Sequence, residues 1–103
     1  MDNERIKMLQ QGALDEPDDP FYPYGLALEY LKGEPGKAAE LLEGLMRSHP
    51  DYLPTYYTAA KLFSVSQSER AIAILEAGLE LSKAQQNAKA QREIQSALDE
   101  LMF

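Results

Sequence analysis

The chain contains no cysteine and only one histidine, His49. Without cysteine there is no disulfide and no thiolate metal site. A single histidine also excludes a His–His metal pair and any relay that needs a second imidazole. We therefore expect the protein to use neither a metal nor a cofactor.

Basic residues are also scarce, because ten Lys and Arg stand against seventeen Asp and Glu, for a net charge of -7. Nucleic acids and anionic membrane surfaces are bound by clustered Lys and Arg, which this sequence lacks. The same charge disfavours strongly acidic peptides as ligands. An acidic surface of this kind keeps a small protein soluble, so we expect no nucleic-acid partner and no membrane partner.

Long hydrophobic runs are missing too. No window approaches the roughly 18 apolar residues of a membrane-spanning helix, and residues 1–5 lack the basic start and apolar stretch of a signal peptide. Hydrophobic residues make up 45% of the chain and charged residues 26%, which is typical of a soluble globular protein. We expect a cytoplasmic protein of one domain, residues 1–103.

Motifs for catalysis are absent as well. Ser64, Ser66 and Ser68 lie outside any Gly-x-Ser-x-Gly frame, and no Gly-rich phosphate loop is present. The acidic run over residues 15–19 lacks the central Gly and terminal Glu of a calcium loop. His49 precedes a proline at an expected helix end, where a cation is favoured by the helix dipole. The sequence therefore predicts that the protein is not an enzyme.

What the sequence does contain is an internal repeat with a fixed offset. Leucine recurs at positions 9, 42 and 75, and the same offset relates Tyr24 to Tyr57, Ala27 to Ala60 and Tyr30 to Phe63. A period between about 20 and 50 residues, such as this one of about 33, indicates an architecture of stacked repeats. Repeats of this kind bury their apolar faces against one another and present an extended surface to partners.

Helical periodicity runs along the whole chain, and no segment shows the alternation of a strand. It predicts a leading helix over 4–16, a first repeat over 20–50, a second repeat over 53–85 and a capping helix over 88–101. Asp19 before Pro20 indicates a helix start, and Ser66 with Glu69 fits a capping box. The leading helix has no preceding partner, so we expect Ile6 and Met8 to be exposed.

The repeated positions resemble the tetratricopeptide repeat, a helix–turn–helix unit of about 34 residues. The first unit matches at Leu26-Ala27, Tyr30, Ala38, Leu42, Leu45 and Pro50, and the second at Tyr56, Ala59-Ala60, Phe63, Ala71, Leu75 and Gly78. Lys83 replaces the closing proline of the second unit, so we expect that helix to run past the usual stop. The chain thus resembles a small two-repeat protein of bacterial type.

The resemblance implies an all-α fold, a right-handed superhelical stack of antiparallel helix hairpins (a TPR-like α-solenoid) with about six helices. It also implies a scaffold or adaptor that binds a partner protein or peptide in a concave apolar-aromatic groove. The groove positions implied are Phe21, Tyr24, Leu28, Leu31, Tyr57, Thr58, Lys61, Ser64 and Val65. The paired Lys and Asn residues with which some family members bind terminal carboxylates are not found at the matching positions.

Two alternatives to an open groove remain. In the first, the leading helix or the capping helix covers the same residues, which are then ordinary core. In the second, the groove or an exposed end of the stack forms a homodimer, and the protein is a structural self-association module. Exposed apolar ends are natural dimerisation surfaces. The identity of the partner does not follow from the sequence.

Overall fold

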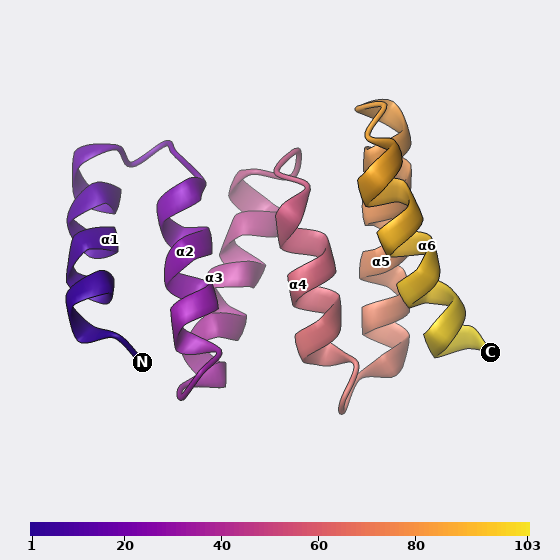
Figure 1. Cartoon of the computed structure of the whole chain (residues 1–103), viewed down its shortest axis with the longest axis horizontal. Coiled ribbons are helices and arrows are strands. Elements are labelled where there is room, and N and C mark those ends of the chain that lie inside the picture. The colour runs from indigo at the N-terminus through magenta and orange to yellow at the C-terminus, as the bar shows by residue number, and fades with distance from the viewer. The chain divides into compact units, whose positions relative to one another are not determined.

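Six α-helices and no β-strand make up the computed structural model, which describes residues 1–103 (Figure 1). The helices are α1 (Asn3–Asp15), α2 (Phe21–Tyr30), α3 (Pro35–Ser48), α4 (Pro54–Phe63), α5 (Ser68–Ala84) and α6 (Ala88–Met102). They divide between two compact units, Met1–Tyr52 and Leu53–Phe103. The all-α fold predicted from the sequence is confirmed.

The first unit is built by α1, α2 and α3, with α2 packed against both of the others. Ile6 and Leu9 of α1 meet Leu26 of α2 in a shared core. The expectation that Ile6 is exposed is therefore wrong: its side chain is 9% exposed, whereas Met8 is 74% exposed. Ile6 is buried because the face of α1 that carries it packs on α2 and needs no helix before it.

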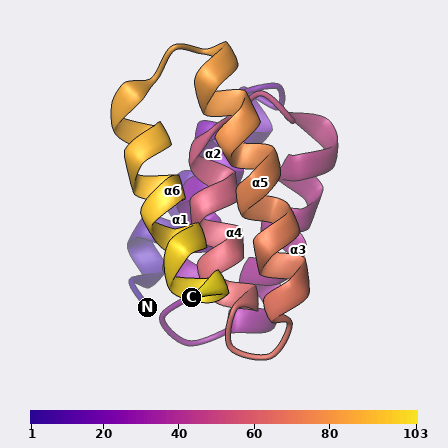
Figure 2. The same ribbon diagram turned by 90° about the vertical axis from the view of Figure 1, so that its right-hand side faces the viewer.

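The second unit is built by α4, α5 and α6, and here α5 is the helix packed against both neighbours. Figure 2 shows α6 running beside α5. Leu75 of α5 and Ile94 and Leu98 of α6 are buried. Gly78 permits a close approach, because a Cβ built there would lie only 2.9 Å from the Cβ of Tyr56 on α4.

Each unit contains one hairpin of the repeat, α2–α3 or α4–α5. Small residues are buried where the paired helices pack: Ala27, Ala38, Ala60 and Ala71. The side chains of Leu42 and Leu75, which occupy the same position in successive repeats, are also buried. These burials agree with the register predicted from the sequence, since small side chains let two helix axes approach closely.

A cation–π contact that we did not predict also recurs at the same offset. The Lys37 ammonium lies 5.3 Å from the centroid of the Tyr30 ring. The Arg70 guanidinium lies 4.0 Å from the centroid of the Phe63 ring. Both contacts join the start of the second helix of a hairpin to the end of the first. The repeat therefore preserves a charge–ring contact as well as apolar packing.

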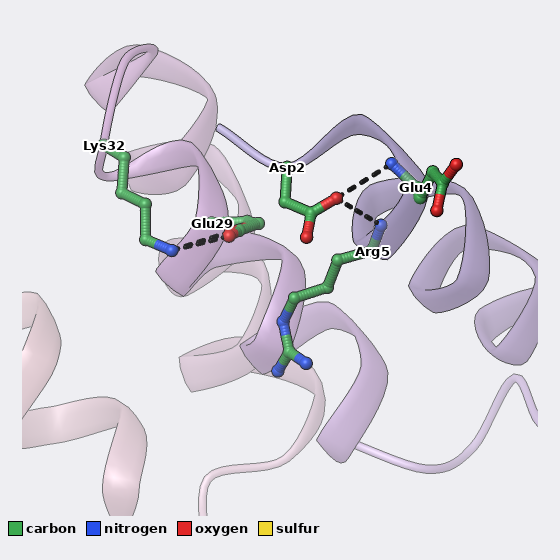
Figure 3. A network of polar contacts seen from close by, with 5 residues as sticks. All are labelled: Asp2, Glu4, Arg5, Glu29 and Lys32. Atoms are coloured by element: carbon green, nitrogen blue, oxygen red, sulfur yellow. Dashed lines mark hydrogen bonds and ion pairs between the residues drawn. The ribbon is translucent and has the colours of Figure 1, made fainter.

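One buried ion pair is special to the first unit. The Lys32 ammonium donates to both carboxylate oxygens of Glu29, at 2.7 and 3.0 Å. The Glu29 side chain is 1% exposed and that of Lys32 is 63% exposed. Figure 3 shows this pair near the start of α1, where the Asp2 carboxylate accepts hydrogen bonds from the amides of Glu4 and Arg5. A buried carboxylate of this kind needs such a partner.

The helix ends test the capping predictions. Asp19 Oδ1 accepts a hydrogen bond from the amide of Phe21 at 2.9 Å, as predicted, but α2 begins at Phe21 with Pro20 as its N-cap, one residue later than expected. The capping box at Ser66 is wrong, because Gln67 occupies the N-cap of α5 and makes no side-chain cap. The amides of Ser66 and Gln67 instead bond to the Phe63 carbonyl, which sets the helix start at Ser68.

The long second helix of the second repeat is confirmed. α3 ends at Ser48, which corresponds to Leu81 in the next repeat, but α5 continues to Ala84. Lys83 lies in this extension, and the amide of Gln85 still bonds to the Leu81 carbonyl at 2.9 Å. Because proline would remove an amide donor and clash with the preceding turn, its replacement by lysine lets the helix run on.

Candidate functional site

A pocket of about 110 Å³ opens in the second unit between α4 and α6. Its lining is Tyr57, Ala60, Lys61 and Ser64 of α4 and its C-cap, Leu75 of α5, and Ala97, Glu100 and Leu101 of α6. Ala60 and Leu75 are buried. The floor of the pocket is therefore apolar, and four of its eight lining residues carry a polar or charged group that can orient a ligand.

Helix geometry brings the lining residues together. Tyr57, Lys61 and Ser64 follow one another at intervals of four and three residues, so they share one face of α4. Ala97, Glu100 and Leu101 share one face of α6 for the same reason. Because α6 packs on α5, as α4 does, α6 supplies a wall opposite Tyr57. The residues on the two helices then enclose a space that neither helix could form alone.

The pocket has one charge of each sign. The Lys61 ammonium lies 6.0 Å from the centroid of the Tyr57 ring, in the range of a cation–π contact. Lys61 is in the last turn of α4, where the helix dipole favours a cation. Ser64 Oγ donates to the Lys61 carbonyl at 2.8 Å. The carboxylate is that of Glu100, an exposed residue on the α6 side.

A larger hollow of about 300 Å³ adjoins the pocket along α6. It shares Tyr57, Ala97 and Glu100 with the pocket and adds Arg92, Glu93 and Ser96. Glu93 is matched by Lys89, whose ammonium lies 3.8 Å from its carboxylate. The site is therefore a small apolar pocket that continues into a wider, polar hollow.

Three of the five positions expected on this side of the groove line the pocket: Tyr57, Lys61 and Ser64. Tyr57 is 38% exposed, so its ring is accessible. Thr58 is half-buried and lies outside the pocket lining, as does Val65, whose side chain is 90% exposed. The structure thus brings part of the expected set together in one concave site.

The other four expected positions lie in the first unit. Phe21 and Leu28 are exposed, and Tyr24 and Leu31 are half-buried. The ring of Tyr24 packs edge-on against that of Tyr52, with centroids 5.5 Å apart. Burial, followed by the charges of Tyr24 and Asp19, raises the pKa of Tyr52. All four expected positions lie on α2 or at its C-cap.

Comparison with known proteins decides the family. Neither a known family model nor a curated protein matches the chain. Solved structures do match, among them two of tetratricopeptide repeat domain proteins from Salinibacter ruber. A solution NMR structure is 34% identical with a TM-score of 0.79, over 84% of this chain and 90% of the other. A crystal structure is 34% identical with a TM-score of 0.76, over 81% and 94%.

The chain belongs to the tetratricopeptide repeat family. This confirms the resemblance found in the sequence, together with the TPR-like fold. The TPR fold is in general a protein–protein interaction module, and domains of this type are typically non-enzymatic scaffolds. Of the six helices of this TPR protein, none is long and apolar enough to cross a membrane.

The wall that α6 contributes was missed in the sequence. Ala97 and Leu101 lie on an apolar stripe of α6 that also carries Ile94 and Leu98. Both residues are half-buried. The signal that could have found them is Glu100, a charge at the edge of the stripe on the same face.

Both ring nitrogens of His49 make hydrogen bonds within the first unit. Its Nε2 lies 2.9 Å from the Asp18 carbonyl, and its Nδ1 lies 2.9 Å from Ser48 Oγ. Because a carbonyl can only accept, Nε2 donates to the Asp18 carbonyl, and Nδ1 accepts from the Ser48 hydroxyl. The ring thus ties the end of α3 to the loop before α2. No group of three or more Asp, Glu and His side chains in the structure could hold a metal ion.

A second contact holds the acidic loop between α1 and α2, residues 16–20. A hydrogen bond to Glu16, with the nearby charge of the same carboxylate, raises the pKa of Tyr22. The Tyr22 ring also covers Gly12 of α1, where a Cβ would overlap the ring. The loop between α1 and α2 is therefore held by Tyr22 and His49.

Proposed function

We propose that the protein is an adaptor that binds a segment of a partner protein in the pocket between α4 and α6. The observation that carries this proposal is the concave site formed by Tyr57, Lys61 and Ser64 opposite Ala97 and Leu101. Tyrosine at such a site gives a large, rigid contact area, which suits recognition. The general role of TPR domains in protein interaction supports the same conclusion.

A protein segment suits this site better than a small metabolite. The pocket of about 110 Å³ opens into a hollow of about 300 Å³ that runs along α6. One side chain fills the former while its neighbours in the sequence lie over the latter. The apolar surface of α2, with Phe21 and Leu28 exposed, is proposed as a further contact surface of the adaptor. Such binding needs no cofactor.

The proposal is tested by affinity capture from a lysate of the source cells. The parent protein is compared with the double variant Tyr57→Ala/Lys61→Glu, and captured proteins are identified by mass spectrometry. We expect the variant to keep its helical circular dichroism and to lose a partner that the parent retains. Undiminished capture by the variant would rule out the pocket as the binding site.

A matched control is available in the other unit. Lys7→Glu makes the same change in charge at an exposed position of α1. This control should retain the partner. Loss of the partner by both variants would show that net charge, and not the pocket, governs capture.

Self-association is the second candidate function. The observation that favours it is the exposure of two large apolar side chains on α1, Met8 at 74% and Leu14 at 76%. If the oligomer is the working form, the mass measured by sedimentation should rise with protein concentration. Met8→Lys with Leu14→Lys should then return the protein to a monomer. A constant monomer mass at high concentration would exclude this candidate.

A further inference from the structure

The two charges of the pocket are not matched within the protein. Lys61 and Glu100 line the same pocket but form no ion pair with each other. Neither residue takes part in the ion pairs that join Lys32, Lys37, Lys83 and Lys89 to acidic residues three or four positions away. Lys61 has only the Tyr57 ring beside its ammonium group. An unmatched cation and an unmatched anion therefore stand at one apolar pocket.

The volume of the pocket limits the group that fills it. A closed apolar cavity of about 150 Å³ takes a benzene ring, and this pocket measures about 110 Å³. An aliphatic side chain the size of leucine therefore suits it better than a phenyl ring. Ala60, Leu75, Ala97 and Leu101 provide the apolar contacts that such a side chain requires.

Charge decides which residues flank this anchor. A uniformly basic segment would meet Lys61 and Arg92, which is a second cation without an ion pair in the adjoining hollow. A uniformly acidic segment would meet Glu100 and a protein of net charge -7. Only a segment with both signs can match Lys61 and Glu100 at once, because complementary charges discriminate among partners at an interface.

We infer that the pocket selects a partner segment with one aliphatic anchor, a basic residue placed toward Glu100 and an acidic residue placed toward Lys61. This inference rests on the proposed function and names the partner chemistry of the same site. The anchor supplies most of the affinity, and the two flanking charges supply the selection. Contacts between exposed charges change affinity by a small factor each.

The test uses the full chain and synthetic peptides that are acetylated and amidated, so that their termini carry no charge. The mixed peptides have the cores Lys-Lys-Leu-Glu-Glu and Glu-Glu-Leu-Lys-Lys, which cover both directions of binding. The others carry four Lys, four Glu or four Gln around the same Leu. Affinities are measured by fluorescence anisotropy at low salt. We expect one mixed peptide to bind about fourfold to tenfold more tightly than the Gln peptide.

Variants of the protein show which of its two charges acts on which charge of the peptide. Glu100→Gln should narrow the difference in affinity between the Glu peptide and the mixed peptide, because the repelling carboxylate at the pocket is gone. Lys61→Gln should do the same for the Lys peptide. Replacing the Leu anchor by Phe should weaken binding, and replacing it by Ala should abolish it. The preference for mixed peptides should shrink at high salt.

A pocket-filling variant separates this inference from the proposed function. Ala97→Leu should weaken every peptide about tenfold or more, with Tyr57→Ala as a second variant should Ala97→Leu lose its helical circular dichroism. If the Gln peptide binds as tightly as the mixed one and still depends on Ala97, the flanking charges play no part. The inference is then wrong, whereas the pocket keeps its function as a binding site.

Two other outcomes also overturn the inference. If none of the peptides binds, the partner chemistry is wrong, and the adaptor function is decided by the capture experiment alone. If the protein forms a dimer that Ala97→Leu dissolves, the occupant of the pocket is a second copy of the chain. Sedimentation of the parent and of Ala97→Leu, without peptide, distinguishes this last case.

Discussion

The two compact units share a hairpin and differ in the helix that completes them. In the first unit α1 precedes the hairpin and packs on α2, the first helix of the pair. In the second unit α6 follows the hairpin and packs on α5, the second helix. The repeat therefore fixes the hairpin, while the added helix determines which face of it is enclosed. The pocket arises in the second unit because α6 leaves Tyr57 opposite Ala97 and Leu101.

Equivalent positions of the two repeats show how far the hairpins themselves diverge. The buried Glu29 of the first unit corresponds to the half-buried Leu62 of the second. Lys32, the partner of Glu29, corresponds to the exposed Val65. An ion pair in one hairpin is thus replaced by two aliphatic residues in the other. The small residues at the helix contact, by comparison, are the same in both.

The largest effect is expected where the hairpins are most alike. Ala27→Leu in the first unit and Ala60→Leu in the second would each place a large side chain at a buried helix contact. Overpacking of this kind costs about 1 to 3 kcal/mol. Urea unfolding followed by circular dichroism measures the cost, and Ala77→Leu on an exposed position of α5 is the control. If both variants were as stable as the parent, the predicted alignment of the two repeats, on which the comparison depends, would be wrong.

The ion pair offers the next test, because it exists in one hairpin only. Lys32→Ala leaves the buried Glu29 carboxylate without its partner, which we expect to cost about 1 to 2 kcal/mol of unfolding free energy. Glu29→Leu installs the residue found at the corresponding position of the second hairpin, and a well-packed apolar replacement of a buried charge is close to neutral.

The double variant Glu29→Leu/Lys32→Ala completes the cycle. It should be nearly as stable as Glu29→Leu alone, because in that variant Lys32 no longer has a carboxylate to pair with. A loss equal to the sum of the two single losses would show that Lys32 acts independently of Glu29.

The sequence predicted the hairpins well because their contacts recur. The fixed offset of the repeat pairs Ala27 with Ala60 and Leu42 with Leu75, and each of these is buried. The long α5 was also predictable, because Lys83 stands where a proline would stop the helix. Because the chain contains two copies of the hairpin, its repeats can be aligned with each other, as related sequences are aligned in other proteins.

The added helices and the turns were harder to predict. α6 does not follow the repeat, so its periodicity gives an apolar stripe but not the neighbour of each residue in that stripe. Its contribution to the pocket, through Ala97 and Glu100, depends on packing against α5 and could not be read from spacing. The capping of α5 was mispredicted because backbone bonds to the Phe63 carbonyl, and not the Ser66 side chain, define the turn before Ser68.

Two glycines compare a close contact inside a hairpin, between α4 and α5, with a close contact of an added helix, between α1 and α2. In Gly78→Ala the new Cβ would lie 2.9 Å from the Cβ of Tyr56, which is fixed to the backbone of α4. In Gly12→Ala it would meet the ring of the half-buried Tyr22, which can rotate away. We expect Gly78→Ala to cost about 1 kcal/mol and Gly12→Ala to cost less.

Gly44→Ala is the control for these two variants, because a Cβ there has no neighbour within 4 Å. Alanine in the interior of α3 should stabilise the protein by about 0.5 to 1 kcal/mol through helix propensity alone. Thermal unfolding of the three variants gives the order of their stabilities. A stabilised Gly78→Ala variant would show that α4 and α5 can separate at that point without cost.

The smallest expected effect concerns the charge–ring contact that both hairpins share. The guanidinium of Arg70 lies closer to its ring, at 4.0 Å from the centroid of Phe63, than the ammonium of Lys37 does to Tyr30, at 5.3 Å. A planar guanidinium also stacks on a ring face, which an ammonium cannot do. Double-mutant cycles with Arg70→Gln and Phe63→Leu, and with Lys37→Gln and Tyr30→Leu, isolate each contact from the other interactions of the same side chains. We expect a coupling of about 0.5 to 1 kcal/mol for Arg70–Phe63 and a smaller one for Lys37–Tyr30. Equal couplings would mean that the distance and shape of the cation do not matter here, and that the two hairpins are energetically interchangeable at this contact.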